Sequence, residues 1–316
     1  MTLREAINRY IAWRQAHGAK YKSGAGILHH FLKSVDGEAD CDAVTTAQVL
    51  AFLAGKGPLT RHRENKHYAL AGFYRYAISR GYASRSPLPD NEPRPPASAP
   101  PHIYSRDELR RLFDFDAIEV SRRSAVQLDA ATFRTLLFLL YGAGLRVGEA
   151  LRLTLADVDL SGALLTIRGT KFFKSRLVPI GPHLTHVLKT YVPLRASRPL
   201  PQGRDSFFLA NRDGMPLAHS TIHEAFAELR RAAGIHGANG ARQSPRLHDL
   251  RHSFAVHRLT NWYRQGSDVQ RLLPVLSTYL GHADLEGTKV YLSMMPELLQ
   301  QASSRFARYA SGGNDA

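Results

Sequence analysis

Residues 130–153 read AATFRTLLFLLYGAGLRVGEALRL, and this stretch indicates the kind of fold that the C-terminal two-thirds of the chain adopts. Its first half is apolar at helical spacing and predicts a helix over 130–141, which Gly142 and Gly144 end. A second helix is predicted directly afterwards, near 146–153, with Arg146 in its first turn and Glu149 one turn later. A guanidinium group binds phosphate oxygens through paired hydrogen bonds, and a carboxylate three residues away can hold it in place. The structural alternative is a surface helical ion pair, worth roughly 0.3 kcal/mol.

Two short strands are predicted next. The runs ALLTIRG (163–169) and SRLVPI (175–180) are rich in β-branched and aliphatic residues, and the segment TKFFK separates them, which is typical of a β-hairpin. Lys171 and Lys174 lie in its turn, where a lysine can reach into a groove and donate a proton; a solvated turn is the alternative. From residue 220 onward the pattern is mostly helical, so the whole C-terminal part is predicted as helices around a small hairpin.

A proline-rich stretch precedes this part. Residues 84–102, SRSPLPDNEPRPPASAPPH, hold seven of the 17 prolines and predict a semi-rigid spacer. We therefore expect an N-terminal domain over 1–85, a linker over 86–102 and a second domain over 103–316. The first domain shows only helical patterns, and the last of its predicted helices gathers basic residues at one end, where they are candidates for DNA contact or for a solvated face: Arg61, Arg63 and Lys66.

Composition limits the class of protein. Lysine and arginine total 42 against 27 acidic residues, and a net charge of +15 favours a polyanionic partner such as nucleic acid. One cysteine excludes a disulfide framework and a cysteine-rich zinc module. We expect a soluble, cytoplasmic protein, because no apolar stretch is long enough to span a bilayer and charged residues interrupt the first 13 positions.

Two further segments carry candidate chemistry. In SPRLHDLRHSFAVHRL (244–259), His248 and Arg251 share a helical face and could contact one phosphate. His248 and His252 are alternatively spaced as metal ligands, but the stretch lacks the HExxH glutamate and has no cysteine nearby. In YLGHADLEGTKVYLSM (279–294), His282 follows a glycine and Tyr291 could be a covalent nucleophile, or simply a packed side chain.

Taken in this order, the segments LRVGEALRL, HDLRH and LGH…Y resemble the tyrosine recombinase family, also called the phage-integrase or Xer-like family. The similarity covers about 103–308, and the stretch FYRYAISRGY (73–82) resembles that family's core-binding domain. The resemblance implies a mainly α fold with a small β-sheet, in which an N-terminal, helical, SAM-like core-binding domain precedes a mixed α/β catalytic domain.

The resemblance also implies a mechanism. Tyr291 would attack a DNA phosphate and form a 3′-phosphotyrosyl link, without a cofactor or an obligatory metal. Arg146 and Arg251 would clamp the phosphate, and Glu149 would support the site. The remaining roles fall to His248 in proton transfer, to His282 in a hydrogen bond to a phosphate oxygen, and to Lys171, preferred over Lys174, as general acid.

Double-stranded recombination sites are the implied partner, bound by a homotetramer, with a sister recombinase or an accessory DNA-bending protein as possible additions. We favour the integrase or transposase of a mobile element over an Xer-like chromosome or plasmid dimer resolvase. A type IB topoisomerase and a non-catalytic DNA-binding protein with the same fold are the alternatives from other classes.

Overall fold

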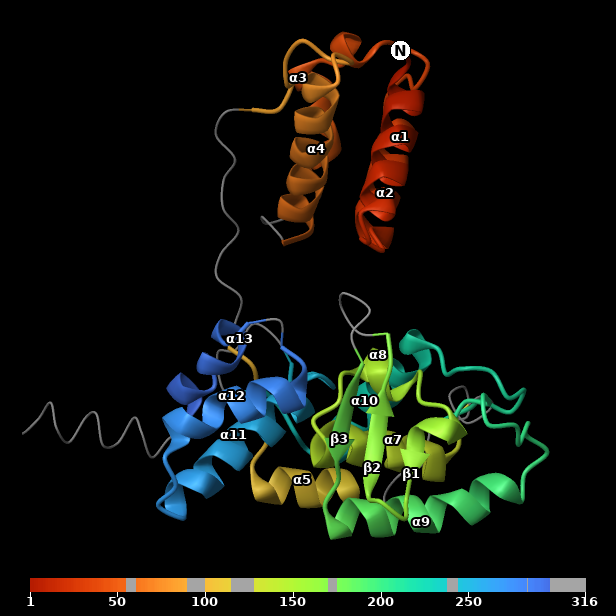
Figure 1. The fold of residues 1–316 in the computed structure, drawn as a ribbon, viewed down its shortest axis with the longest axis vertical. Helices are drawn as coiled ribbons and strands as arrows, with labels where there is room; N and C mark the ends of the chain where they lie inside the picture. The colour runs from red at the N-terminus through yellow and green to blue at the C-terminus, as the bar shows by residue number, and fades with distance from the viewer. Residues whose placement is uncertain are drawn as a thin grey trace, which may run out of the picture. The chain divides into compact units, whose positions relative to one another are not determined.

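The computed structural model describes residues 1–54, 61–89, 100–114, 128–169, 175–237, 244–282 and 284–295, and the chain divides into two compact units, Met1–Ser98 and Ala99–Ala316. Each unit is mainly helical, and the second holds a small sheet (Figure 1), so the predicted fold class is confirmed. The division falls within the proline-rich stretch 84–102. Most of that stretch lies outside the described residues, and the domain limits of the sequence analysis stay a prediction.

The N-terminal unit consists of α1 (Leu3–Ala16), α2 (Lys22–Leu32), the 3-10 turn η1 (Cys41–Ala43), α3 (Thr46–Leu53) and α4 (Arg61–Ser79). α3 begins with a capping box, in which Thr45 and Gln48 satisfy each other's backbone N–H groups. The apolar faces of α1 and α4 form much of the core, because their side chains recur every three or four residues: Leu3, Ile7, Tyr10 and Ile11 on α1, and Leu70, Phe73, Tyr74 and Ala77 on α4.

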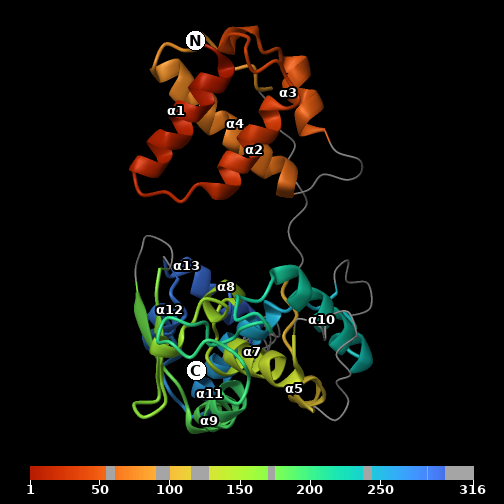
Figure 2. The same cartoon turned by 90° about the vertical axis from the view of Figure 1, so that its right-hand side faces the viewer.

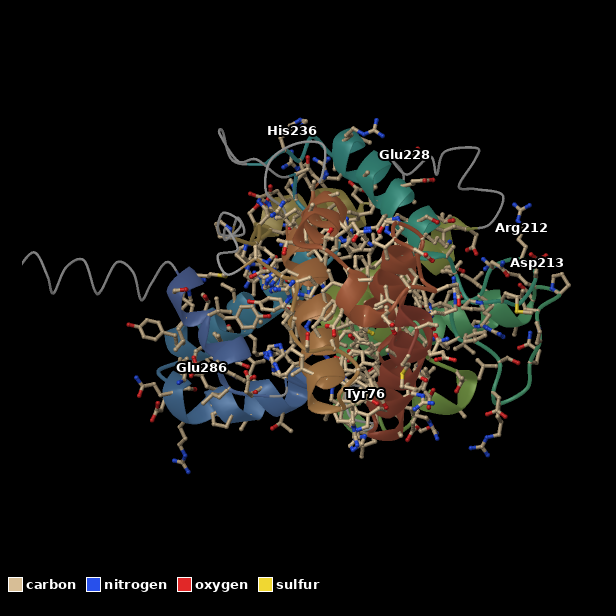
Figure 3. All side chains as sticks on the ribbon, turned by 90° about the horizontal axis from the view of Figure 1, so that it is seen from above. Tyr76, Arg212, Asp213, Glu228, His236 and Glu286 are labelled. Carbon is tan, nitrogen blue, oxygen red and sulfur yellow. The ribbon has the colours of Figure 1, made fainter. Side chains whose placement is uncertain are left out.

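Aromatic rings join α1 to α4. The Tyr10 ring lies 5.9 Å from that of Phe73 and 5.3 Å from that of Tyr76, which is labelled in Figure 3. Trp13, one turn along α1, also contacts Tyr76, at 5.3 Å. These ring contacts hold the two long helices of the unit together.

The C-terminal unit is built around α7 (Ala130–Gly142), which is buried along most of its length. Around it lie α5 (Arg106–Phe113), α8 (Val147–Ala150), the 3-10 turn η3 (Leu155–Asp157), α9 (Pro182–Ala196), α10 (His219–Ala232), α11 (Asp249–Arg264), α12 (Val269–Leu280), α13 (Glu286–Lys289) and η5 (Leu292–Met294). α9 and α11 pack directly against α7, as the second view shows (Figure 2).

The predicted helix after the glycines is shorter than expected. α8 ends at Ala150, three residues before the predicted limit. Backbone bonds to a distant segment explain the difference, because the Leu153 carbonyl accepts from Phe208 N at 2.7 Å and Leu155 N donates to the Ser206 carbonyl at 3.0 Å. A local helical pattern does not reveal such partners.

The predicted hairpin is present. β2 (Leu164–Ile167) pairs antiparallel with β3 (Arg176–Pro179), and β1 (Val158–Asp159) adds a third strand in the order β1-β2-β3 within the described residues. β1 was not predicted, because two residues carry no alternating pattern. The Tyr279 hydroxyl of α12 donates to the Pro179 carbonyl at 3.0 Å, which fixes the end of α12 beside β3.

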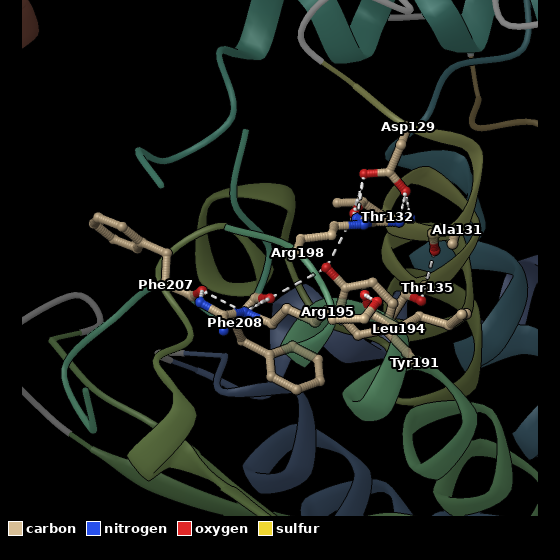
Figure 4. A network of polar contacts seen from close by, with 11 residues as sticks. Asp129, Ala131, Thr132, Thr135, Tyr191, Leu194, Arg195, Arg198, Phe207 and Phe208 are labelled. Atoms are coloured by element: carbon tan, nitrogen blue, oxygen red, sulfur yellow. Dashed lines mark hydrogen bonds and ion pairs between the residues drawn. The ribbon is translucent and has the colours of Figure 1, made fainter. Parts of the chain in front are cut away.

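A polar network fixes the N-terminal end of α7 (Figure 4). Arg198 donates to both carboxylate oxygens of Asp129, the N-cap of α7, at 2.6 and 2.7 Å. Arg195, 1% exposed, donates to the carbonyls of Phe207 and Phe208 at 2.9–3.2 Å. The Tyr191 hydroxyl of α9 lies 3.0 Å from Thr132 Oγ1 of α7, and this contact joins α9 to the helix that leads into the glycine turn.

Candidate active site

The turn between α7 and α8 requires glycine. Gly144 has a φ of +60°, and a Cβ built there would lie 2.5 Å from the Phe254 ring of α11. This close approach brings the Gly144 carbonyl to Arg251 and makes Arg146 the N-cap residue of α8. The sequence motif therefore acts by packing a tight turn against α11.

Glu149 lies at the centre of a group of arginines. It is 4% exposed, and its carboxylate accepts from Arg146 Nη1 at 2.8 Å and from Arg176 Nη1 and Nη2 at 3.0 and 2.9 Å. Arg251 Nη1 lies 3.8 Å from the same carboxylate. Burial alone would raise the pKa of Glu149, but the hydrogen bonds and charges of Arg176 and Arg146 outweigh burial and lower the pKa to about 2. Glu149 is therefore ionised at neutral pH.

The two predicted clamp arginines also tie together the loops of the site. Arg146 Nη2 donates to the Gly281 carbonyl at 2.9 Å. Arg251, 1% exposed, donates from Nη1 to the Gly144 carbonyl at 2.6 Å and from Nη2 to the Leu280 carbonyl at 2.7 Å. Burial and the Arg146 charge lower the pKa of Arg251 to about 10, so that it remains charged at pH 7. The turn before α8 and the end of α12 are thus joined through guanidinium groups.

Two histidines of the site are neutral at pH 7. Burial, reinforced by the neighbouring His252 ring and the charge of Arg251, lowers the pKa of His248 to about 4. Burial and the charges of Arg251 and Arg146 lower the pKa of His282 to about 4. His282 Nδ1 lies 2.6 Å from Oγ1 of the buried Thr288, a contact that orients its ring.

Tyr291 lies among these groups and is 2% exposed. Its hydroxyl lies 3.0 Å from His252 Nδ1, and its ring is inclined by 30° to that of His282, with centroids 6.1 Å apart. Burial raises the pKa of Tyr291, while the charges of Arg251 and Arg146 act in the opposite direction. One phenol hydroxyl, two guanidinium groups and three imidazoles therefore converge from segments that are far apart in the sequence.

The model of the phage integrase family matches residues 104–297, the region that carries this site. The chain belongs to the phage integrase family. It is thus a tyrosine recombinase, of the class of enzymes that cleave and rejoin DNA.

Relatives of this integrase-family chain are similar along nearly its whole length. A protein of Sinorhizobium fredii with the provisional name integrase/recombinase y4rB is 35% identical over 312 residues, which cover 97% of this chain and 98% of the relative. The tyrosine recombinase XerA of Thermococcus onnurineus is 27% identical over 314 residues, 98% of each chain. The structure of the XerH site-specific recombinase in a post-cleavage complex with its palindromic difH substrate shares the fold, with a TM-score of 0.63 at 21% identity over 91% of this chain and 79% of that one.

Most of the predicted site residues of this recombinase lie close together. The structure gathers these six: Arg146, Glu149, His248, Arg251, His282 and Tyr291. Lys171 and Lys174 lie outside the described residues. The three predicted DNA-contacting residues lie in the other unit, at the start of α4, where Arg61 pairs with Glu64 at 3.2 Å and Lys66 donates to the Phe52 carbonyl at 2.7 Å.

Arg176 was not predicted as a site residue from the sequence. It lies two residues before the buried Val178 in β3, and alternation therefore places both side chains on the inner face of the strand. An arginine at an inward position requires polar partners, and this signal could have marked Arg176 as a candidate partner of a buried acid such as Glu149.

The metal interpretation of His248 and His252 gains no further ligand from the structure. No three histidine, cysteine, aspartate or glutamate side chains gather into a candidate metal site among the described residues. The two imidazole rings lie nearly perpendicular, 4.9 Å apart, and His252 contacts the Tyr291 hydroxyl.

No helix in the described part is long and apolar enough to cross a membrane.

Proposed function

We propose that this family member is a site-specific recombinase that cuts and rejoins DNA through a 3′-phosphotyrosyl intermediate on Tyr291. The convergence of the Tyr291 hydroxyl with Arg146 and Arg251 carries the proposal. The phenol oxygen bonds to phosphorus while the bond to the 5′ oxygen breaks, and a 5′-hydroxyl of a second strand later reverses the step. The bond energy is kept in the phosphotyrosyl link, so the reaction needs neither ATP nor another cofactor, and no obligatory metal.

The charged groups act on the phosphate. Attack adds negative charge to the phosphoryl oxygens, and fixed guanidinium groups in a water-poor site stabilise that charge. Arg146 and Arg251 fill this role, and Glu149 holds Arg146 in place. His282, oriented through Nδ1 by Thr288, is placed to donate from its other ring nitrogen to a phosphate oxygen.

Two proton transfers complete the step. We assign the protonation of the leaving 5′ oxygen to Lys171, in preference to Lys174, because Lys171, counted back from the RLVP run, falls at the position of the family's lysine. His248 assists the proton transfer at Tyr291, because its neutral ring lies one helical turn from the residue that contacts the hydroxyl.

The unit Met1–Ser98 is the proposed core-binding domain, which grips DNA together with the catalytic unit. Its proposed phosphate contacts are those of Arg61, Arg63 and Lys66 at the start of α4. Lys66 has a second role, because its ammonium group satisfies a carbonyl near the end of α3 and lies 4.4 Å from the Phe52 ring.

Double-stranded recombination sites are the proposed substrate, bound by a homotetramer with or without a sister recombinase or a DNA-bending protein. We favour integration or transposition of a mobile element over dimer resolution. The greater similarity to integrase/recombinase y4rB than to XerA, 35% against 27% identity, supports this choice.

The decisive experiment is covalent capture of DNA. Nicked, 5′-radiolabelled duplexes that tile the DNA flanking the coding sequence are incubated with the protein and resolved on a denaturing gel. Wild type and the control Tyr263→Phe should form a covalent adduct, whereas Tyr291→Phe should form none yet retard the same duplex on a native gel. An adduct that persists in Tyr291→Phe contradicts the assignment of the nucleophile.

A further inference from the structure

His252 lies within hydrogen-bond distance of the proposed nucleophile, yet the mechanism above gives it no role. It lies on α11, one turn after His248 and next to Arg251. Its Nδ1 is 3.0 Å from the Tyr291 hydroxyl oxygen, and the two rings are tilted with centroids 5.6 Å apart. Resting on the function proposed above, we propose that His252 is a catalytic residue that accepts the Tyr291 hydroxyl proton during attack on the DNA phosphate.

The distance favours His252 over the other two histidines. A general base must lie about 2.6–3.2 Å from the atom that gives up the proton, and His252 Nδ1 meets this condition. His248 lies edge-on against the His252 ring, with 4.9 Å between centroids, and therefore contacts the proposed base. His282 stacks on the face of the Tyr291 ring and engages Thr288 through Nδ1.

The protonation states fit the same role. Burial lowers the pKa of His252, so its imidazole is neutral at pH 7 and has a lone pair to accept a proton. Burial raises the pKa of Tyr291, so the phenol keeps its proton until a base removes it. The Asp249 carboxylate, on the same helix, favours the charged form of His252 and therefore stabilises the imidazolium that forms.

The proposed step is balanced. As the Tyr291 oxygen forms its bond to phosphorus, its proton passes to His252 Nδ1, and the bond from phosphorus to the 5′ oxygen breaks. The electron pair of the broken bond stays on the 5′ oxygen, which is protonated by the general acid on the other side. In the rejoining direction, His252 returns its proton to the departing phenolate.

The test uses the covalent-capture assay under single-turnover conditions. His252→Asn keeps an oxygen acceptor near the position of Nδ1 but cannot take up a proton. We expect its cleavage rate to fall at least about 100-fold, the lower end of general-base effects, with DNA binding within about twofold of wild type. His257→Asn is the matched control, because His257 lies on the same helix and contacts the Tyr141 hydroxyl at the same 3.0 Å; its rate should stay within about threefold.

Chemical rescue separates proton transfer from a structural effect. Added imidazole should restore cleavage by His252→Ala at least about tenfold and leave His257→Ala unchanged. The proposal is overturned if His252→Asn cleaves within threefold of wild type, if imidazole gives no rescue, or if His252→Ala cleaves faster, which would mark the contact as a resting-state latch. Each of these results leaves the proposed function standing, since that function fails only if wild type forms no adduct or Tyr291→Phe forms one.

Discussion

Replacing Glu149 by glutamine removes the carboxylate that lies among Arg146, Arg176 and Arg251. Glutamine has nearly the same volume, so the variant changes charge and hydrogen bonding with little change in packing. Its amide NH₂ group cannot accept from a guanidinium donor. We expect Glu149→Gln to destabilise the C-terminal unit, because buried cations are left without their counter-charge.

The expected size follows from the pKa. Folding lowers the pKa of Glu149 from 4.5 to about 2, which corresponds to roughly 3 kcal/mol of stability at neutral pH. Because the folded-state pKa is the lower one, this stability is fully present above pH 4.5 and is lost as the pH falls towards 2. Loss of one partner from a buried ion pair costs about 3–5 kcal/mol, so Glu149→Gln should lower the free energy of unfolding at pH 7 by at least about 3 kcal/mol.

The assay can follow the affected unit alone. The chain has two tryptophans, Trp13 in α1 and Trp262 in α11, so a Trp13→Phe background leaves Trp262 as the fluorescence probe of the C-terminal unit. Urea unfolding is then measured at pH 7 and between pH 5 and 3. The control is Glu286→Gln, since Glu286, labelled in Figure 3, is 76% exposed and its ion pair with Lys289 should contribute less than about 0.5 kcal/mol.

Two outcomes would refute this reasoning. A loss below about 1 kcal/mol at pH 7 would show that Glu149 is not needed to hold the arginines together. Equal acid sensitivity of Glu149→Gln and wild type between pH 5 and 3 would show that another group is responsible for the pH dependence.

The remaining predictions concern one loop and one helix. Gly281 has a φ of +68°, and a Cβ atom at this position would lie 2.6 Å from Arg176 Nη1. Gly281→Ala should therefore lower the cleavage rate at least about tenfold in the capture assay, while the variant still retards DNA on a native gel. An unchanged cleavage rate would contradict the role of this turn. Neutralising Arg61 and Arg63 together with glutamine should reduce the slope of log affinity against log salt by about 2, and an unchanged slope would refute their phosphate contacts. Lys66→Met should instead lower the thermal midpoint reported by Trp13 in a Trp262→Phe background, since Lys66 bonds to the Phe52 carbonyl; an unchanged midpoint would contradict that role.

Sequence patterns predicted the parts of the fold that are set locally. The helix over 130–141 and the hairpin were both found, because periodicity depends on neighbours within a few residues. The length of α8 was missed because distant backbone partners end it, and the strand β1 was missed because two residues are too short to show an alternating pattern. Spacing alone could not supply those partners.

The candidate site shows the same division. The order of motifs predicted which residue types belong together, and the structure brings Arg146, Arg251 and Tyr291 into one place. The order of motifs could not predict which atoms of these residues are in contact. His252 was considered only as a metal ligand, and its contact with Tyr291 joins residues 39 positions apart through packing of α11 against the segment after α13.

The charge balance of the site explains why a carboxylate belongs beside a phosphate clamp. In the described part, the three guanidinium groups around Glu149 and its one carboxylate give the site a net charge of 3 − 1 = +2. His248 and His282 add no charge at pH 7, because burial lowers their pKa values to about 4. A phosphodiester carries one negative charge, whereas the species formed on attack carries about two. A site of charge +2 therefore matches the transition state better than the bound substrate, and only such a difference accelerates the chemical step. Glu149 therefore has two effects. It fixes the arginines in position, and it lowers the positive charge of the site, so that the uncleaved phosphodiester is bound less strongly than the transition state.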